Sequence, residues 1–228
     1  KRSKIYRARE VHTEDIKIEN GIVVSGTGYL FGFDEDNSME APLGKATAGR
    51  NNIRGVSYLY AAEDMATACA EIKTVPKSLI SVAEIELVSD IKIFDFCNGF
   101  YTTETGEDGT LDVGALFTEA AMQFYRPVGN ENEYGVTQLI ADYVRKTGVD
   151  GIAYRSFFTG KKNYTIFNSH KSKVRFKESR LVANQGAVSY YWDFNDAKCI
   201  IAKQNGVEYE EAHSDDVRQM VTEALKCG

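Results

Sequence analysis

The sequence predicts an α+β fold in which helices flank a β-sheet, with a β-meander and a helix appended at the C-terminus. Three observations indicate this fold. Short runs of β-branched and apolar residues, typical of strands, lie on both sides of two segments with helical periodicity. The character of the chain then changes at about residue 186. With 228 residues, 43% of them hydrophobic and 26% charged, the chain suits one large folded domain with an extension.

The first part of the chain predicts strands separated by a long loop. We expect strands at residues 4–9, 28–33 and 57–61. Residues 34–55 are rich in Asp, Asn, Gly and Pro, which favour turns, and therefore predict a long surface loop. Long ordered loops in compact domains often carry function. We therefore expect this loop to contribute to a site.

A short helix is predicted next. The Asp64 side chain can accept hydrogen bonds from the amides of a first helical turn, which favours a helix over residues 65–73. Pro76 prevents the helix from continuing. The apolar, β-branched runs at 79–87 and 91–96 then predict two strands.

Two longer helices follow, each marked by apolar residues at helical spacing. The residues that define them are Leu116, Phe117, Ala120, Ala121 and Phe124 in the first, and Val136, Leu139, Ile140, Tyr143 and Val144 in the second. Gly148 stands in the position usual for a glycine that ends a helix. Strands are predicted at 151–155 and 163–168, joined by a loop that holds Gly160, Lys161 and Lys162.

The last part of the chain predicts a separate piece. We divide the chain into a main domain at 1–185 and an extension at 186–228. The runs VSYYWDF, KCIIAK and GVEYEE indicate a β-meander, with turns at Asn195-Asp196 and Asn205-Gly206. Val217, Met220, Val221 and Leu225 predict a final amphipathic helix. The residues of this extension indicate no function that we can identify.

Composition argues against several classes of protein. The net charge is 27 − 33 = −6, whereas nucleic-acid binders are usually basic. The basic segment 171–177 is typical of a solvated strand. No run of about 18 apolar residues predicts a membrane span, and the four cysteines show no zinc-ligand spacing, so we expect no metal. Sparse cysteines favour the cytoplasm, although secretion stays open. Because the chain starts at Lys1 without a methionine, we expect that a segment was removed there.

The segment Gly49–Ile72 carries the main candidates for a site. It places Arg50 on the predicted loop, Tyr60 at a strand end and Glu71 on the short helix. Polar groups from different elements that converge on a mostly apolar cleft are a common way to bind a small ligand. The sequence therefore predicts a small site for a charged aromatic ligand.

The same segment belongs to a series of blocks that resembles one family. YRAR at 6–9, APLGKATAGRNNIRGVSYLYAAEDMATACAEI at 41–72, FYRPV at 124–128, TQLIADYV at 137–144 and GIAYRS…NYTIFN at 151–168 occur in the order seen in RES-domain toxins. The resemblance covers about residues 5–182. One departure is Ile53, which stands where the family often has a proline. The residues after 186 resemble nothing that we recognise.

The resemblance implies a fold and an activity. RES domains are similar to ADP-ribosyltransferases, which implies a mixed β-sheet core and a cleft that binds NAD⁺ as substrate. It implies a toxin that breaks the nicotinamide–ribose bond by hydrolysis or phosphorolysis. ADP-ribosyl transfer to a protein and an inactive partner-binding module are the alternatives. An Xre-type antitoxin is the partner implied, and a homodimer stays open. The sequence indicates neither a membrane nor nucleic acid as a partner of the chain by itself.

Each site residue then acquires an expected role. The Arg50 guanidinium suits the diphosphate, the Tyr60 ring suits the nicotinamide, and the Glu71 carboxylate suits the positive charge that develops on the ribose. Ser156 is expected to position Arg50 or to bind the ligand. Arg7, Tyr6 and Arg54 are further candidates for contacts with NAD⁺, and Lys45 and Asn168 are weaker ones.

These residue types also have structural interpretations. Arg50 can pair with a surface carboxylate, Tyr60 can pack within the sheet, and Glu71 can lie on a solvated helix face. Ser156 by itself carries no functional signal. Only the joint order of the blocks favours the site.

Overall fold

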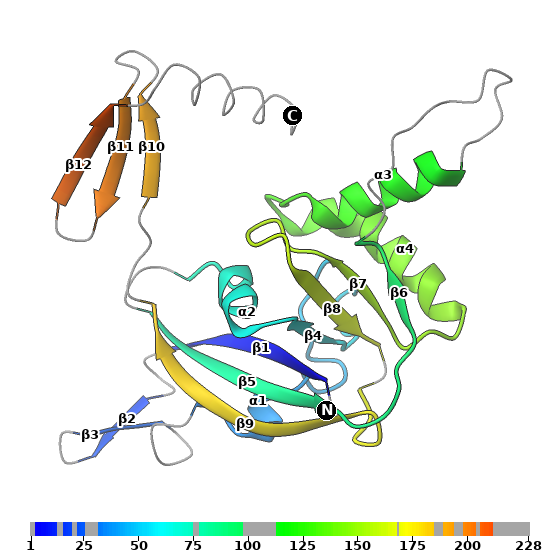
Figure 1. The fold of residues 1–228 in the computed structure, drawn as a ribbon. Helices are drawn as coiled ribbons and strands as arrows, with labels where there is room; N and C mark the ends of the chain where they lie inside the picture. The colour runs from blue at the N-terminus through cyan, green and yellow to red at the C-terminus, as the bar shows by residue number, and fades with distance from the viewer. Residues whose placement is uncertain are drawn as a thin grey trace, which may run out of the picture. The chain divides into compact units, whose positions relative to one another are not determined.

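The computed structural model describes residues 3–12, 16–19, 22–25, 32–74, 78–97, 113–167, 169–184, 189–193, 198–203 and 206–211. The described residues fall into two units, of which the first ends at Ala183 and the second begins at Asn184. Figure 1 shows the first unit as a sheet with helices on it and the second as a small sheet of its own. The division between domains predicted at residues 185 and 186 stays a prediction.

Seven strands of the first unit form one sheet, in the order β6-β7-β8-β4-β1-β5-β9. Their bounds are Lys4–Val11 (β1), Leu59–Ala62 (β4), Leu79–Leu87 (β5), Ile93–Asp95 (β6), Gly151–Arg155 (β7), Lys162–Ile166 (β8) and Val174–Ala183 (β9). Neighbouring strands are antiparallel except β6 and β7, which are parallel. A separate hairpin joins β2 (Ile16–Glu19) and β3 (Ile22–Ser25). The mixed sheet confirms the predicted α+β class.

The sheet has a weak seam between β1 and β4. β4 pairs with β8 through four residues, but its register with β1 consists of the pair Tyr6–Ala62. β1 in turn pairs along its whole length with β5. The strands β6, β7 and β8 therefore run in a different direction from β1, β5 and β9, as Figure 1 shows. A seam of this kind leaves room for a cleft between two well-packed halves.

Helices cover both halves of the sheet. They are α1 (Glu35–Ser38), α2 (Met65–Glu71), α3 (Val113–Tyr125) and α4 (Gly135–Lys146), and the 3₁₀ helix η2 (Glu131–Tyr134) precedes α4. α3 and α4 pack on β7, whereas α2 contacts β1, β4, β5 and β8. One apolar core, which includes Phe96, Phe124 and Ile152, lies in the half with α3 and α4. A second core, with Leu59 and Ile85, also contains Ile166 of β8 and therefore spans both halves.

Most of the predicted elements of the first unit are confirmed within two residues. β5 and β7 have the predicted bounds. Asp64 caps α2 by accepting a hydrogen bond from the Thr67 amide at 2.8 Å, as the sequence indicated. Gly148 follows α4 with φ of +83°, the left-handed conformation expected where a glycine ends a helix.

Some boundaries differ from the prediction. Of the expected strand at 28–33, residues 28–31 lie outside the described residues, and Gly32 and Phe33 are not in a strand. The local reason is that the Phe33 amide donates to the side-chain hydroxyl of Ser81 on β5, at 2.8 Å, instead of to a backbone carbonyl of a strand. α2 ends at Glu71 rather than Lys73, which has a left-handed φ of 50°. The loop at 34–55 contains the single-turn helix α1.

The second unit is an antiparallel meander of β10 (Ser189–Asp193), β11 (Lys198–Lys203) and β12 (Gly206–Glu211). This arrangement confirms the predicted β-meander. The final helix predicted around Val217 and Leu225 lies outside the described residues, and so do Asn195, Asp196 and Asn205 of the predicted turns. Gly206 is the first residue of β12.

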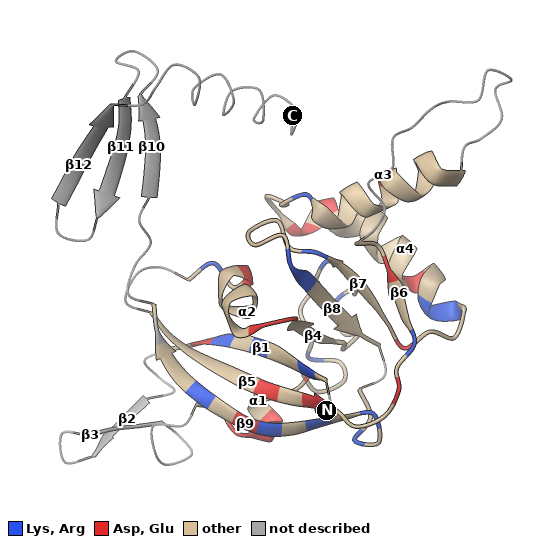
Figure 2. Cartoon of the chain, in the orientation of Figure 1, with Lys and Arg blue, Asp and Glu red and all other residues tan. Residues whose placement is uncertain are grey.

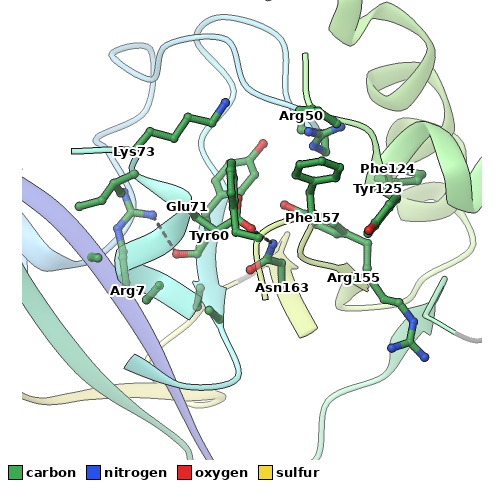
Figure 3. A pocket seen from close by; sticks show the side chains of 18 of the residues that line it. Arg7, Arg50, Tyr60, Glu71, Lys73, Phe124, Tyr125, Arg155, Phe157 and Asn163 are labelled. Carbon is green, nitrogen blue, oxygen red and sulfur yellow. Dashed lines mark hydrogen bonds between the residues drawn. The ribbon is translucent and has the colours of Figure 1, made fainter. Parts of the chain in front are cut away.

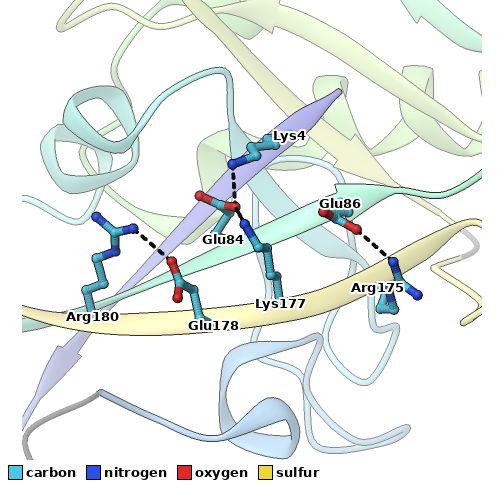
Figure 4. A network of polar contacts seen from close by, with 7 residues as sticks. All are labelled: Lys4, Glu84, Glu86, Arg175, Lys177, Glu178 and Arg180. Carbon is cyan, nitrogen blue, oxygen red and sulfur yellow. Dashed lines mark hydrogen bonds and ion pairs between the residues drawn. The ribbon is translucent and has the colours of Figure 1, made fainter. Parts of the chain in front are cut away.

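The basic segment 171–177 is neutralised by carboxylates. Lys171, Lys173, Arg175 and Lys177 lie within ion-pair distance of Glu35, Asp150, Glu86 and Glu84, respectively. Figure 4 shows how Glu84 on β5 lies between Lys4 of β1 and Lys177 of β9, at 2.7 and 2.8 Å. The charged residues of β5 are acidic, whereas those of β9 are mostly basic (Figure 2). Residues 171–173 form a turn and β9 starts at Val174, so the expected solvated strand is confirmed for the second half of the segment.

Two kinds of feature are missing from the described part of the chain. It contains no helix long and apolar enough to cross a membrane. It also contains no cluster of three His, Cys, Asp or Glu side chains that could hold a metal ion.

Candidate active site

A cleft of about 480 Å³ opens at the seam between β1 and β4. Residues from β1, β4, β7, β8, α2, α3 and the turn after β7 line it. Tyr154, Asn163, Ala62 and Tyr6 oppose one another in register across β7, β8, β4 and β1. Opposed residues of antiparallel strands point to the same face of a sheet. This row of side chains therefore faces the cleft, and Arg50, Tyr60 and Glu71 line the same cleft.

The loop that carries Arg50 is fixed by buried hydrogen bonds. Asn52, which is 4% exposed, donates from its side-chain amide to the carbonyl oxygens of Thr47 and Val56, both at 2.8 Å. The Gln138 side chain of α4 donates to the carbonyls of Gly49 and Asn52, both at 2.9 Å. The loop is therefore held from within and from α4, although Ile53 replaces the family's proline.

Tyr60 is tied into this loop through its hydroxyl. The hydroxyl donates to Asn52 Oδ1 at 2.6 Å and accepts from the Asn51 amide at 2.9 Å. Burial raises the pKa of the Tyr60 phenol far above its usual value. A Cβ at Gly49 would lie 2.8 Å from the Tyr60 oxygen, so the backbone can approach only because residue 49 is a glycine. The hydroxyl is thus structural, and the ring is the part of Tyr60 that the cleft can use.

Arg50 points into the cleft from the loop. Its Nη1 donates to the Gln123 carbonyl of α3 at 3.1 Å, and its guanidinium lies 5.8 Å from the centre of the Tyr134 ring. The sequence also allowed Arg50 to pair with a surface carboxylate, but no ion pair of Arg50 is found among the described residues. A carbonyl and a ring position the guanidinium without neutralising its charge. Its positive charge therefore faces the cleft.

Glu71 is the last residue of α2 and is half-buried. One carboxylate oxygen accepts a hydrogen bond from the Asn163 side-chain amide at 2.7 Å. Asn163 is 4% exposed and lies on β8, so its amide is fixed by the sheet. Figure 3 shows this contact at the centre of the cleft, between Arg7 on one side and Phe157 on the other. The carboxylate is thus oriented rather than free on a solvated helix face.

Arg7 adds a second positive charge. Its Nη1 donates to the Tyr60 carbonyl at 3.1 Å. Its Nε is buried and has no hydrogen-bond partner among the described residues. Burial, assisted by the nearby charge of Arg9, lowers the pKa of Arg7 to about 10. A buried donor without a partner is rare and suggests a place for a ligand acceptor.

The structure does not bring Ser156 to the cleft. Ser156 is fully buried, and its hydroxyl accepts hydrogen bonds from the amides of Phe158 and Thr159 at 3.2 and 3.3 Å. It therefore shapes the turn between β7 and β8 and contacts neither Arg50 nor the cleft in the structure. Asn168 lies outside the described residues.

Among the other candidates, Tyr6 lines the cleft and Lys45 does not. Arg54 pairs with Glu131 at 3.1 Å on the surface. The structure thus supports a cleft role for Tyr6 alone.

Several lining residues were not predicted from the sequence. Asn163 and Tyr154 stand inside the GIAYRS…NYTIFN block. Each lies two residues from a buried residue of its own strand, Thr165 or Ile152, and so shares its face of the sheet, which was a usable signal. Burial raises the pKa of Tyr154 to about 12, so its phenol is neutral. Phe157 and Phe158 carried no signal, because exposed aromatic residues in a turn follow no periodicity.

The cleft therefore has two walls. We call Arg7, Tyr60, Glu71 and Asn163 the polar wall, because hydrogen bonds join them to one another or to the loop. We call Tyr125, Phe157 and Phe158 the aromatic wall, because their rings contact one another.

Comparison with known families now identifies the chain. The model of the RES domain matches residues 30–193. The chain belongs to the RES domain family. The match includes Arg50, Tyr60 and Glu71 and confirms the resemblance found in the sequence blocks, whereas Arg7 precedes it.

Comparisons with individual proteins add little to this assignment. No curated protein matches the chain significantly. Among solved structures, a chain in the crystal structure of the M. tuberculosis MbcT–MbcA toxin–antitoxin complex is similar, with 12% identity and a TM-score of 0.40. The match covers 80% of this chain and 84% of that chain. The family assignment of the RES domain rests on the family model.

Proposed function

We propose that this RES domain cleaves NAD⁺ at the bond between nicotinamide and ribose. The observation that carries the proposal is the Glu71 carboxylate, which Asn163 orients in a cleft that also holds two arginines and the Tyr60 ring. An anionic diphosphate, a cationic pyridinium ring and a ribose that gains positive charge need these three kinds of group. Membership of the RES domain family supports the same activity.

The roles follow from charge and shape. Arg50 has an un-neutralised guanidinium, which can bind phosphate oxygens in a bidentate manner. Arg7 also lines the cleft, and its guanidinium can donate to a second acceptor of the substrate. The Tyr60 ring can stack on the pyridinium, a cation–π contact worth roughly 0.5–2 kcal/mol. The fixed Tyr60 hydroxyl keeps this ring in one orientation.

Glu71 stabilises the reacting centre. When the bond from ribose C1′ to the nicotinamide nitrogen breaks, both electrons leave with nicotinamide, which becomes neutral. Positive charge then develops on C1′ and the ring oxygen. A carboxylate held in advance near that position lowers the barrier without reorganising during the reaction. Water, which loses a proton, or phosphate then forms the new bond to C1′.

The test is release of nicotinamide from NAD⁺ by the purified protein. Glu71→Gln keeps the size of the side chain but removes its charge, so we expect loss of activity of about 100-fold or more. Glu119→Gln changes an exposed glutamate of α3 outside the cleft and should leave the rate unchanged. No release of nicotinamide with water, phosphate or cell lysate present would refute the proposal. Label transferred from NAD⁺ to a lysate protein would assign the alternative, ADP-ribosyl transfer.

We further propose that the protein is a cytoplasmic toxin with an Xre-type antitoxin. The support for this role is membership of the RES domain family, because the resemblance to RES-domain toxins implies an Xre-type antitoxin as partner. Induced expression should stop growth and lower cellular NAD⁺, and Glu71→Gln should relieve both effects. Growth arrest by the Glu71→Gln protein would show that toxicity does not depend on this cleft.

A further inference from the structure

Two adjacent phenylalanines are exposed at the cleft. Phe157 and Phe158 are 44% and 45% exposed, and both line the cleft. The ring of Phe157 lies 5.4 Å from that of Tyr125 and 5.7 Å from that of Phe158. Single exposed apolar residues are common. A group of exposed rings at the edge of a pocket is instead typical of a surface that receives a ligand.

The turn that carries these rings is well fixed. Besides the bonds to the buried Ser156 hydroxyl, the Ser156 amide donates to the Lys161 carbonyl at 2.7 Å. The Thr159 and Thr67 hydroxyls lie 2.9 Å apart and join the turn to α2. The ion pair between Lys161 and Asp64 makes a second link to α2. The exposure of the two rings is therefore built into the fold rather than caused by a loose turn.

A lysine completes this edge of the cleft. Lys73 follows α2 in the left-handed conformation, with φ of 50°, which is costly for a residue with a side chain. Its ammonium lies 5.5 Å from the centre of the Phe158 ring. This conformation is common in the residue that follows the C-cap of a helix. Here it brings a positive charge next to the aromatic wall.

We propose that the aromatic wall binds the adenine ring of the substrate, an inference that rests on the proposed function. The substrate has two flat rings, and the cleft offers ring contacts in two places, at Tyr60 and at the aromatic wall. The positive charge of Lys73 disfavours the cationic nicotinamide at the aromatic wall. The same charge suits a neutral purine that is followed by phosphates. The carboxylate of Glu71, at the centre of the cleft, favours the cationic nicotinamide at Tyr60 instead.

The test compares two substrates of the proposed reaction. Nicotinamide mononucleotide has the bond that breaks but lacks adenine. In the double variant Phe157→Ala/Phe158→Ala, we expect the KM for NAD⁺ to rise about 10-fold with little change in kcat, since the rings on which the base stacks are removed. We expect kcat/KM for nicotinamide mononucleotide to stay within twofold of the unaltered protein. An unchanged KM for NAD⁺, or an equal loss with both substrates, would overturn the inference.

Two controls separate stacking from structure. Phe157→Tyr/Phe158→Tyr keeps both rings and should retain the original KM. Tyr143→Ala removes an aromatic residue that is 73% exposed on α4, outside the cleft, and should change neither substrate's kinetics. A raised KM for NAD⁺ in either control would contradict a role for the rings in stacking.

Binding of adenosine monophosphate distinguishes failure of this inference from failure of the proposed function. Calorimetry with the Glu71→Gln protein measures this binding without turnover. We expect binding, weakened about 10-fold by the double alanine change. If nicotinamide is never released but this result holds, the proposed function fails and the adenine site stands. If the Glu71→Gln protein binds adenosine monophosphate equally well with and without the double alanine change, the adenine site is overturned, whatever the activity on NAD⁺.

Discussion

The two walls of the cleft are built in different ways. In the polar wall, Arg7, Tyr60 and Glu71 each make a hydrogen bond within the wall or to the adjoining loop. In the aromatic wall, the rings of Phe157 and Phe158 contact one another and remain almost half exposed, while the backbone behind them is fixed. The polar wall thus holds charged groups in fixed orientations, whereas the aromatic wall exposes apolar ring surface. This difference fits the two proposals: breaking the nicotinamide–ribose bond needs oriented charges, and binding the adenine ring needs apolar surface.

The largest effect in this series is expected from the residue that orients the carboxylate proposed to be catalytic. Asn163→Ala removes the amide that holds Glu71 at 2.7 Å, so the carboxylate can leave its position. Misplacement by about 1 Å can cost a factor of ~100 in rate. We therefore expect kcat for nicotinamide release to fall by that order, with a smaller change in KM. A full kcat in a folded Asn163→Ala protein would show that the polar wall needs no such orientation.

A smaller effect is expected where the loop meets Tyr60. In Gly49→Ala the new methyl group would lie 2.7 Å from Asn52 Oδ1 and 2.8 Å from the Tyr60 oxygen, so the buried hydrogen bonds must shift. Overpacking of this kind costs about 1–3 kcal/mol of unfolding free energy, which denaturant unfolding measures.

Gly135→Ala is the matched control for the Gly49 change. Gly135 begins α4 with φ of −52°, and a methyl group added there would have no described neighbour within 4 Å. Alanine should therefore be neutral or slightly stabilising at this position. An equal loss in both variants would mean that the contact with Tyr60 is not the cause.

The smallest effect is expected at the start of α2, which carries Glu71. Asp64→Ala removes the cap on the Thr67 amide and should cost about 1 kcal/mol of unfolding free energy at pH 7. The hydrogen bond from Lys161, followed by that from Thr67, lowers the pKa of Asp64 from its usual value of 3.8 to about 2.

The pH dependence of this effect follows from the lowered pKa. Because the folded pKa lies below the unfolded one, the stabilisation is fully present above about pH 4 and is lost as the pH falls through about 2. The difference between Asp64→Ala and the unaltered protein should therefore shrink over that range in urea unfolding. A difference that stays constant from about pH 7 to about pH 2 would assign it to something other than the carboxylate.

Local patterns predicted much of the fold. The β-branched run at 79–87 and the GIAYR run predicted strands with the observed bounds, because a buried strand is marked by its own residues. Asp64 marked the start of α2 through a contact only three residues away. The prediction was wrong for Gly32 and Phe33, since the Phe33 amide is satisfied by Ser81, a residue distant in sequence.

The site was also predicted only in part, because local patterns do not show which side chains packing brings together. Arg50, Tyr60 and Glu71 follow from the family blocks, and the cleft brings them together. Ser156 stands in a block as well, but its hydroxyl is used by the turn that it begins. Its role depends on whether the side chain points into the cleft or into the core, and that choice is made by packing.

By itself, the sequence determined the α+β class, the strands and helices with strong local patterns, and the family to which the chain belongs. These features depend on residues that are neighbours in sequence or stand in a fixed order within short blocks. Only the tertiary structure decided that Asn163 holds Glu71 and that Phe157 and Phe158 face the cleft. Residues 71 and 163 lie 92 positions apart, and their meeting requires β8 to pair with β4 beneath α2. Strand register is a property of the whole sheet, so no local pattern contains it.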